Sequence, residues 1–245
     1  MAALPRGASQ VTAWRDALPN GVDVIVATPD HIVHAGIVIP VDIFGLRPLF
    51  EDICSRLASH GFAVCAVEPF GRIEADALEG MDRDARRIAV GHLRDDEQIG
   101  DLRAGAELLI ERFGVGEVHG LGFCMGGYYL LKCAAGGIFG RVVSAYGMID
   151  TPDMWRNDGH RSPLLTVADA CPTLAVFGGL DHWTPPEEIA ALRREWAGRD
   201  DCEVVVYPEA DHGFVHAPDI PVHRPDDAWD FWNRTLRFLG RNGLS

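Results

Sequence analysis

Basic residues are scarce in this chain of 245 residues, which has 22 lysines and arginines against 36 aspartates and glutamates. The resulting net charge of −14 opposes binding to nucleic acid or to an anionic membrane surface, because both attract basic proteins. If the substrate is an anion, a local group of arginines must attract it against this overall field. The composition therefore predicts a small-molecule partner, with no nucleic acid and no membrane involved.

Long apolar segments are also missing. Residues 1–14 contain no apolar stretch of the kind found in secretory signal peptides, and no run approaches the roughly 20 residues that a membrane span requires. We therefore expect a cytoplasmic protein. The sequence shows no internal repeat, low-complexity segment or linker, which predicts one domain over residues 1–245.

Paired cysteine motifs are absent as well. The six cysteines show no C-x-x-C spacing, and most of them lie within apolar runs, at positions 54, 65, 124, 133, 171 and 202. In a cytoplasmic protein this pattern favours reduced, buried thiols over disulfides or a zinc site. The cysteines therefore predict neither a zinc site nor a disulfide.

The sequence does contain a regular alternation of strand-like and helix-like segments. Two short runs, 11–14 and 22–27, flank the turn signal Pro19-Asn20-Gly21 and predict an opening antiparallel hairpin. Further strands are expected at 35–41, 62–67, 141–146, 173–177 and 203–207, and in the run that ends at Gly122. Helices are expected at 49–59, near 82–90, and at 95–113, 128–135, 185–197 and 226–239.

This alternation predicts an α/β protein with a doubly wound, mostly parallel sheet of about seven to eight strands flanked by helices. One segment departs from it. Residues 70–94 carry many charges and only weak periodicity. We expect them to form an excursion over the active-site end of the sheet.

The most informative stretch is Gly122-Phe123-Cys124-Met125-Gly126, which joins an apolar strand to a helix. This G-x-C-x-G pattern is typical of the nucleophile elbow of the α/β-hydrolase fold, with a thiol in place of the usual hydroxyl. The two glycines let strand and helix approach closely, and the helix N-terminus favours a thiolate at Cys124. The alternative is a glycine-rich turn with a buried, inert cysteine.

Other reactive side chains follow strands elsewhere in the chain. Asp42, Asp181 and His212 each come directly after a predicted strand or the short loop that follows it, so they converge with Cys124 at one edge of the sheet. The order nucleophile, acid, histidine is that of α/β-hydrolases. We expect His212 to withdraw the thiol proton and Asp181 to orient its ring, although an aspartate before Thr184-Pro185 also suits a simple turn cap.

A carbonyl substrate also needs two N–H donors for its oxyanion. In this fold one donor belongs to the residue after the nucleophile, Met125, and the other to the loop after the third strand, where Ile43 is the candidate. These two backbone groups complete the predicted catalytic set.

Taken together, these motifs resemble the dienelactone hydrolase family, also called carboxymethylenebutenolidase-like, from about residue 21 to 239. The matching segments are 42–45, 122–127, 179–181 and 207–214. The resemblance implies a Cys-His-Asp triad that attacks a small lactone or ester and forms a thiol-acyl enzyme, without metal or cofactor. It also implies a monomer or weak homodimer.

Two positions differ from the family pattern. Members usually carry Glu where this chain has Asp42, and the resemblance assigns that carboxylate the removal of the thiol proton when substrate arrives. Members also place Arg four residues after the catalytic histidine, to hold a substrate carboxylate, where this chain has His216. The candidate substrate contacts are Phe44, Arg83 and His216, with Arg86, Arg87 and Arg94 as other upstream arginines.

Two other functions deserve comparison. Class I glutamine amidotransferases also place a cysteine at a strand-to-helix turn, but they carry a late His-x-Glu that this chain lacks. A non-catalytic or thiol-sensing relative of α/β-hydrolases, with Cys124 as a redox target, would retain the fold without turnover. Hydrolysis of esters or lactones that depends on Cys124 would separate the predicted hydrolase from this non-catalytic relative.

Overall fold

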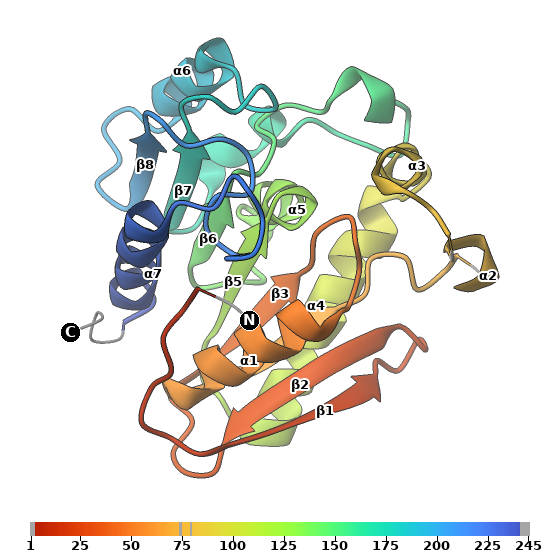
Figure 1. Ribbon diagram of the computed structural model, residues 1–245, viewed down its shortest axis with the longest axis vertical. Coiled ribbons are helices and arrows are strands. Elements are labelled where there is room, and N and C mark those ends of the chain that lie inside the picture. The colour runs from red at the N-terminus through yellow and green to blue at the C-terminus, as the bar shows by residue number, and fades with distance from the viewer. Residues whose placement is uncertain (1–2, 74, 79, 241–245) are drawn as a thin grey trace.

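The computed structural model describes residues 3–73, 75–78 and 80–240. Within them eight strands form one sheet, in the order β1-β2-β4-β3-β5-β6-β7-β8 (Figure 1). The strands are β1 Val11–Ala17, β2 Asp23–Pro29, β3 Ala35–Pro40, β4 Phe62–Val67, β5 Val118–Phe123, β6 Val142–Ala145, β7 Thr173–Gly178 and β8 Cys202–Tyr207.

The first two strands pair antiparallel, with Val11 opposite Pro29, and β2 pairs antiparallel with β4. From β4 to β8 every pairing is parallel. The predicted opening hairpin and the mostly parallel, doubly wound α/β-hydrolase sheet are confirmed. The parallel strands β3 to β7 are buried along their whole length, which explains their unbroken apolar sequences.

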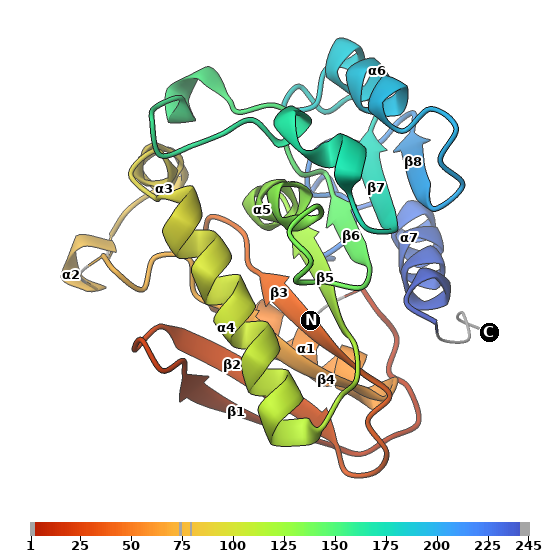
Figure 2. The ribbon, with the colours of Figure 1, turned by 180° about the vertical axis from the view of Figure 1, so that it is seen from behind.

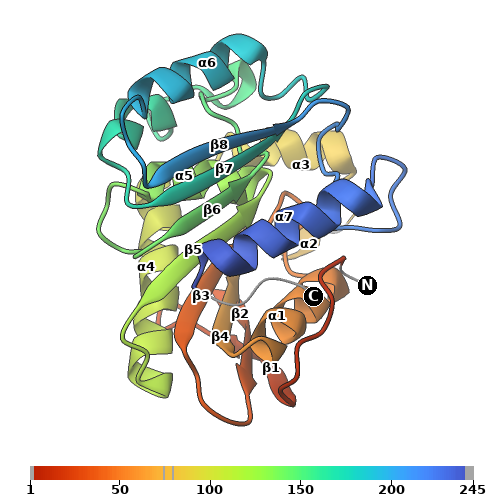
Figure 3. The same ribbon diagram turned by 90° about the vertical axis from the view of Figure 1, so that its left-hand side faces the viewer.

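Helices cover both faces of this sheet, so the molecule has three layers (Figures 1 and 2). Helices α1 (Pro48–Ser59) and α7 (Pro225–Phe238) lie on one face, where Phe50 and Trp232 belong to one buried apolar cluster. Helices α4 (Asp95–Phe113), α5 (Met125–Cys133) and α6 (Pro186–Glu195) cover the other face, around a second cluster. Figure 3 shows the sheet between them from the side.

The segment between β4 and α4 contains two short helices, α2 (Ala75–Leu78) and α3 (Arg83–Val90). The second of these is the helix expected near 82–90. Asp82 caps it, since its carboxylate accepts a hydrogen bond from the N–H of Ala85 (2.8 Å). Three 3₁₀ turns lie between β6 and β7, at η1 (Asp153–Trp155), η2 (Pro163–Leu165) and η3 (Val167–Asp169).

All predicted helix ends agree with the structure within three residues, and α4 spans the predicted 95–113. The largest difference concerns α5, which begins at Met125 instead of residue 128. The helix therefore starts immediately after Cys124, and its first turn borders the thiol. Among the described residues, no helix combines the length and the apolar character that crossing a membrane would require.

Candidate active site

Cys124 lies at the turn between β5 and α5, where the backbone is strained. Its φ of 55° and ψ of −122° place it outside the conformations that non-glycine residues usually adopt. The N–H of Cys124 donates to the carbonyl oxygen of Ala145 (3.0 Å) at the end of β6, which ties the turn to the neighbouring strand. The cysteine is partly exposed and lines a cavity, whereas Phe123 and Met125 beside it are fully buried.

Two glycines make this turn possible, because a side chain at either position would collide with backbone. A Cβ atom on Gly122 would lie 2.5 Å from the carbonyl carbon of Gly126. A Cβ atom on Gly126 would lie 2.0 Å from the carbonyl oxygen of Pro40, at the end of β3. The Gly-x-Cys-x-Gly sequence therefore reflects a close approach of β3, β5 and α5 around the cysteine.

His212, in the loop after β8, contacts both Asp181 and Cys124. Its Nδ1 lies 2.8 Å from Oδ2 of Asp181, and its ring lines the same cavity as the Cys124 thiol, near enough for the two to interact electrostatically. Asp181 follows β7 and is buried, and its Oδ1 accepts the N–H of Trp183 (2.9 Å). The carboxylate is thus fixed at both oxygens, and the imidazole lies between it and the sulfur.

The electrostatics of this arrangement favour the charged form of the His212 ring. Burial by itself lowers the pKa of His212, but the negative charge of Cys124 and hydrogen bonds to Asp181 and Cys124 raise it from 6.5 to about 10. A protonated ring beside the sulfur stabilises a thiolate. The ring of His212 is therefore placed to take the proton of the Cys124 thiol and to hold it.

A second carboxylate–histidine pair lies in the same cavity. Oδ2 of Asp42 lies 3.0 Å from Nε2 of His216, and the guanidinium of Arg47 binds both oxygens of Asp42, at 2.6 and 2.7 Å. Asp42 and His216 are buried. Burial disfavours the charge of Asp42, but hydrogen bonds from His216 and Arg47 hold its pKa well below the usual value.

Tyr146 connects the two pairs. Its ring packs edge-on against His212, with centroids 5.0 Å apart, and its hydroxyl lies 2.6 Å from Nδ1 of His216. Tyr146 is fully buried and is the second non-glycine residue with positive φ (40°) among the described residues. Strain of this kind is concentrated at functional sites. The residue directly follows β6, so it comes from the same sheet edge as the predicted triad.

These side chains border a cavity of about 510 Å³ at the carboxyl ends of the strands. Phe44, Arg83 and His216, the predicted substrate contacts, all line it. So does Arg87, whose guanidinium lies over the ring of Trp183 (5.2 Å to the centroid). The remaining lining is largely apolar or aromatic and includes Met148, Trp155, Trp183, Ala217, Ile220, Pro221 and Val222.

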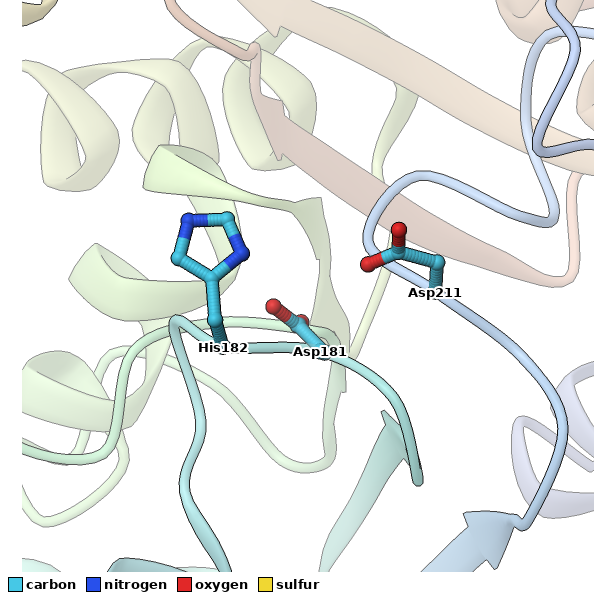
Figure 4. A group of neighbouring side chains, drawn as sticks. All are labelled: Asp181, His182 and Asp211. Atoms are coloured by element: carbon cyan, nitrogen blue, oxygen red, sulfur yellow. The ribbon is translucent and has the colours of Figure 1, made fainter.

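Among the described residues, one group that includes Asp181 has the composition of a metal site. Asp181, His182 and Asp211 offer ligand atoms within 4.8 Å of one another, and Figure 4 shows that they come from the loops after β7 and β8. However, Asp181 is bonded to His212, and Oδ1 of Asp211 accepts the N–H of His212 (2.6 Å). A cation here would compete with the imidazole for Asp181, so the group is better suited to supporting His212.

Comparison with known proteins adds an independent line of evidence. The model of the dienelactone hydrolase family matches residues 22–243. A protein of Escherichia coli O157:H7 described as a "putative carboxymethylenebutenolidase" is 30% identical, and the match covers 99% of this chain and 94% of that protein. The chain belongs to the dienelactone hydrolase family.

Other relatives agree with this assignment. The carboxymethylenebutenolidase of Pseudomonas putida is 27% identical, over 78% of this chain and 79% of its own. The solved structure of a "putative dienelactone hydrolase" from Klebsiella pneumoniae superposes with a TM-score of 0.84 and 25% identity, covering 93% of this chain and 98% of that one. The matches to the Escherichia coli protein and to the Klebsiella pneumoniae structure extend over nearly the whole length of this chain. The chain is therefore a hydrolase of this family.

At this site the sequence predicted the central residues better than it predicted the residues around them. Cys124, Asp181 and His212 lie together as expected, while their chemical roles stay predictions. Arg83 and Arg87 reach the cavity, and Arg86 and Arg94 are absent from its lining.

Sequence reasoning missed Arg47 and Tyr146. Tyr146 directly follows a strand, which is the signal that identified Asp42 and Asp181, so it could have been found. Arg47 lies directly before α1, and nothing in its sequence context indicates that it binds Asp42.

Proposed function

We propose that this protein hydrolyses a small carboxylic ester or lactone through Cys124, His212 and Asp181. The observation that carries the proposal is the imidazole of His212, which lies between the carboxylate of Asp181 and a thiol on a strained strand-to-helix turn. A thiolate at such a turn is a nucleophile, and its protonated partner is an acid ready for the leaving group.

In the first half of the reaction, the Cys124 sulfur attacks the carbonyl carbon and the carbonyl oxygen becomes negatively charged. The backbone N–H groups of Ile43 and Met125 are the proposed donors to this oxyanion. Within the described residues, neither N–H donates to another protein atom. When the tetrahedral intermediate collapses, the bond to the leaving oxygen breaks and that oxygen takes the proton from His212, leaving a thioester.

In the second half, water attacks the thioester and gives its proton to His212. The carbon–sulfur bond breaks, the carboxylic acid is released, and the thiolate–imidazolium pair returns. The balance is ester plus water to acid plus alcohol, or lactone plus water to a hydroxy acid. Asp181 holds the ring in the required orientation and stabilises its charged form throughout.

The lining of the cavity favours a substrate that combines an apolar or planar body with a carboxylate. Arg83 and Arg87 bring positive charge to one side, in a protein whose net charge is −14. Trp155 and Trp183 lie nearly parallel, with centroids 6.4 Å apart and an angle of 14° between the rings. One relative, from Bradyrhizobium sp. and 29% identical, is described as a "probable 2-oxo-3-(5-oxofuran-2-ylidene)propanoate lactonase", whose named substrate has both features.

The test is a panel of short aryl esters and lactones, with and without a carboxylate, given to the wild type and to Cys124→Ala. We expect turnover by the wild type and a loss of about three orders of magnitude or more in the variant, since the nucleophile is gone. Turnover that survives Cys124→Ala would refute the proposed mechanism. A wild type inert to the whole panel would favour the non-catalytic, thiol-sensing alternative.

Labelling with iodoacetamide provides a second test of the same proposal. Burial raises the pKa of each of the other five thiols, Cys54, Cys65, Cys133, Cys171 and Cys202, which slows their alkylation. We therefore expect Cys124 to be alkylated first, and peptide mapping identifies the modified residue. Cys202→Ser is the matched control, because it removes a partly exposed thiol that does not line the cavity.

A further inference from the structure

Among the described residues, the hydrogen-bond partners of the Asp42 carboxylate are Phe44, Arg47 and His216, and the Cys124 thiol is not one of them. Oδ1 accepts Nη1 of Arg47 (2.6 Å) and the N–H of Phe44 (3.0 Å). Oδ2 accepts Nη2 of Arg47 (2.7 Å) and bonds Nε2 of His216 (3.0 Å). Four hydrogen bonds thus fix a buried carboxylate in one orientation.

The same contacts make Asp42 a weak base. His216 and Arg47 stabilise its ionised form enough to hold the pKa well below that of an ordinary aspartate, even though burial acts in the opposite direction. A carboxylate that binds a proton so weakly is poorly suited to take one from a thiol. His212, bonded to Asp181 and lining the same cavity as Cys124, is the better placed group to hold that proton.

Asp42 instead holds the turn that contains Ile43. Its side chain accepts the N–H of Phe44, and its carbonyl oxygen accepts the N–H of Gly45 (3.1 Å). Beyond the turn, the N–H of Leu46 donates to Glu68 (2.7 Å), so the loop is anchored on both sides. The N–H of Ile43, inside this turn, donates to no protein atom among the described residues.

We propose that Asp42 is a positioning residue: clamped by Arg47 and His216, it holds the turn 42–45 so that the N–H of Ile43 points at the developing oxyanion, and it does not remove the thiol proton. This inference rests on the proposed function, because it assigns a role within that reaction. The clamp extends through His216 to Tyr146, whose neighbour Ala145 accepts the N–H of Cys124. The turn at 42–45 and the turn at Cys124 are therefore linked by these hydrogen bonds and by the peptide bond between Ala145 and Tyr146.

Two reactions of Cys124 separate the two possible roles of Asp42. Hydrolysis of a neutral aryl ester requires both the thiolate and the oxyanion donors, whereas alkylation by iodoacetamide requires the thiolate alone. We expect Arg47→Met to lower kcat for the ester by 10- to 100-fold with little change in KM. The alkylation rate constant of Cys124 should stay within about threefold of wild type. Loss of one oxyanion donor costs about 10²- to 10³-fold in kcat, and a misdirected donor costs less.

Two further variants accompany this measurement. Arg47→Lys keeps the charge and loses the two-pronged contact with Asp42, so we expect an intermediate loss of kcat, and this variant carries the test if Arg47→Met fails to fold. Arg15→Met is the matched control, because Arg15 makes a surface ion pair with Glu51 outside the cavity (2.7 Å), and we expect it to behave like wild type in both reactions.

The outcomes are distinct. Parallel losses in ester turnover and in alkylation would overturn the inference and make Asp42 part of thiol activation. Unchanged ester turnover in both Arg47 variants would overturn it as well, since no positioning would then be needed, while the proposed hydrolysis would stand. A wild type that is alkylated at Cys124 but hydrolyses no ester would overturn the proposed function and this inference together.

Discussion

The active-site cavity contains two histidines that look alike in sequence and differ in surroundings. His212 and His216 are four residues apart in one loop, each is bonded to an aspartate, and Tyr146 touches both. The His212 ring has one nitrogen on Asp181 and also contacts the Cys124 thiol. The His216 ring has both nitrogens occupied, by Asp42 and by Tyr146, and stacks on Phe123 with centroids 5.0 Å apart.

The hydrogen-bond partners of His216 also occupy both of its nitrogens. Nε2 donates to the carboxylate of Asp42 and Nδ1 bonds the Tyr146 hydroxyl, so neither nitrogen is left for the thiol. We expect a ring with both nitrogens bonded in this way to hold its neighbours in position and to exchange no proton with substrate. The comparison teaches that an aspartate partner does not by itself make a histidine catalytic: the second nitrogen must face a reactive group.

The largest expected effect separates the two histidines directly. His212→Asn should lower kcat by about 10³- to 10⁴-fold, because the thiolate loses its charged partner and the leaving group loses its acid. His216→Asn should lower it by only about tenfold, through a less firmly held turn at 42–45. Steady-state kinetics with one neutral aryl ester checks both, with thermal unfolding to confirm that each variant is folded. Comparable losses in the two variants would show that the distinction drawn here is wrong.

Two arginines of the cavity differ in the same way as the two histidines, and the expected effect is smaller. Arg47 is committed to Asp42, whereas Arg83 lines the cavity and makes no hydrogen bond or ion pair to another described residue. We expect Arg83→Met to raise KM for a carboxylate-bearing ester about tenfold, the loss of one charge-assisted contact, and to leave the KM of its neutral analogue unchanged. Arg86→Met is the control, since Arg86 bonds the carbonyl oxygen of Leu78 and lies outside the lining. An equal change for both substrates would exclude recognition of the carboxylate.

The sequence was sufficient for most of the fold and for the residues of the proposed triad, for a physical reason. Buried parallel strands have continuous apolar sequences, and reactive residues gather where such strands end, so Cys124 and Asp181 stand out along the chain. The environment of each residue is a different matter. Nothing local in the sequence indicates that Arg47 and His216 both bind Asp42, because that contact joins residues 174 positions apart in the case of His216. Tyr146 lies at the end of a strand, but its contact with two histidines depends on the path of the loop at 211–216.

The smallest expected effect concerns stability in acid and tests the ionised state of Asp42. Its folded-state pKa is depressed, so the stability that its charge provides is complete above the unfolded pKa of about 3.9 and is lost as the pH falls through the lower folded value. Asp42→Asn removes this contribution and leaves the Arg47 and His216 donors with a weaker acceptor. We expect it to lower the free energy of unfolding by about 2 kcal/mol at pH 7.

The difference in free energy of unfolding between wild type and Asp42→Asn should become smaller below pH 4, because the wild-type carboxylate becomes protonated first in the unfolded and then in the folded state. Urea unfolding at pH 7, 5, 4 and 3 measures this difference, with Asp153→Asn as a control, because Asp153 is exposed and its carboxylate pairs with Arg156 alone in the part of the chain that the structure describes. A difference that stays constant across this range would mean that the pair with His216 does not depend on the charge of Asp42. The contrast drawn between His216 and His212 would then lose this support.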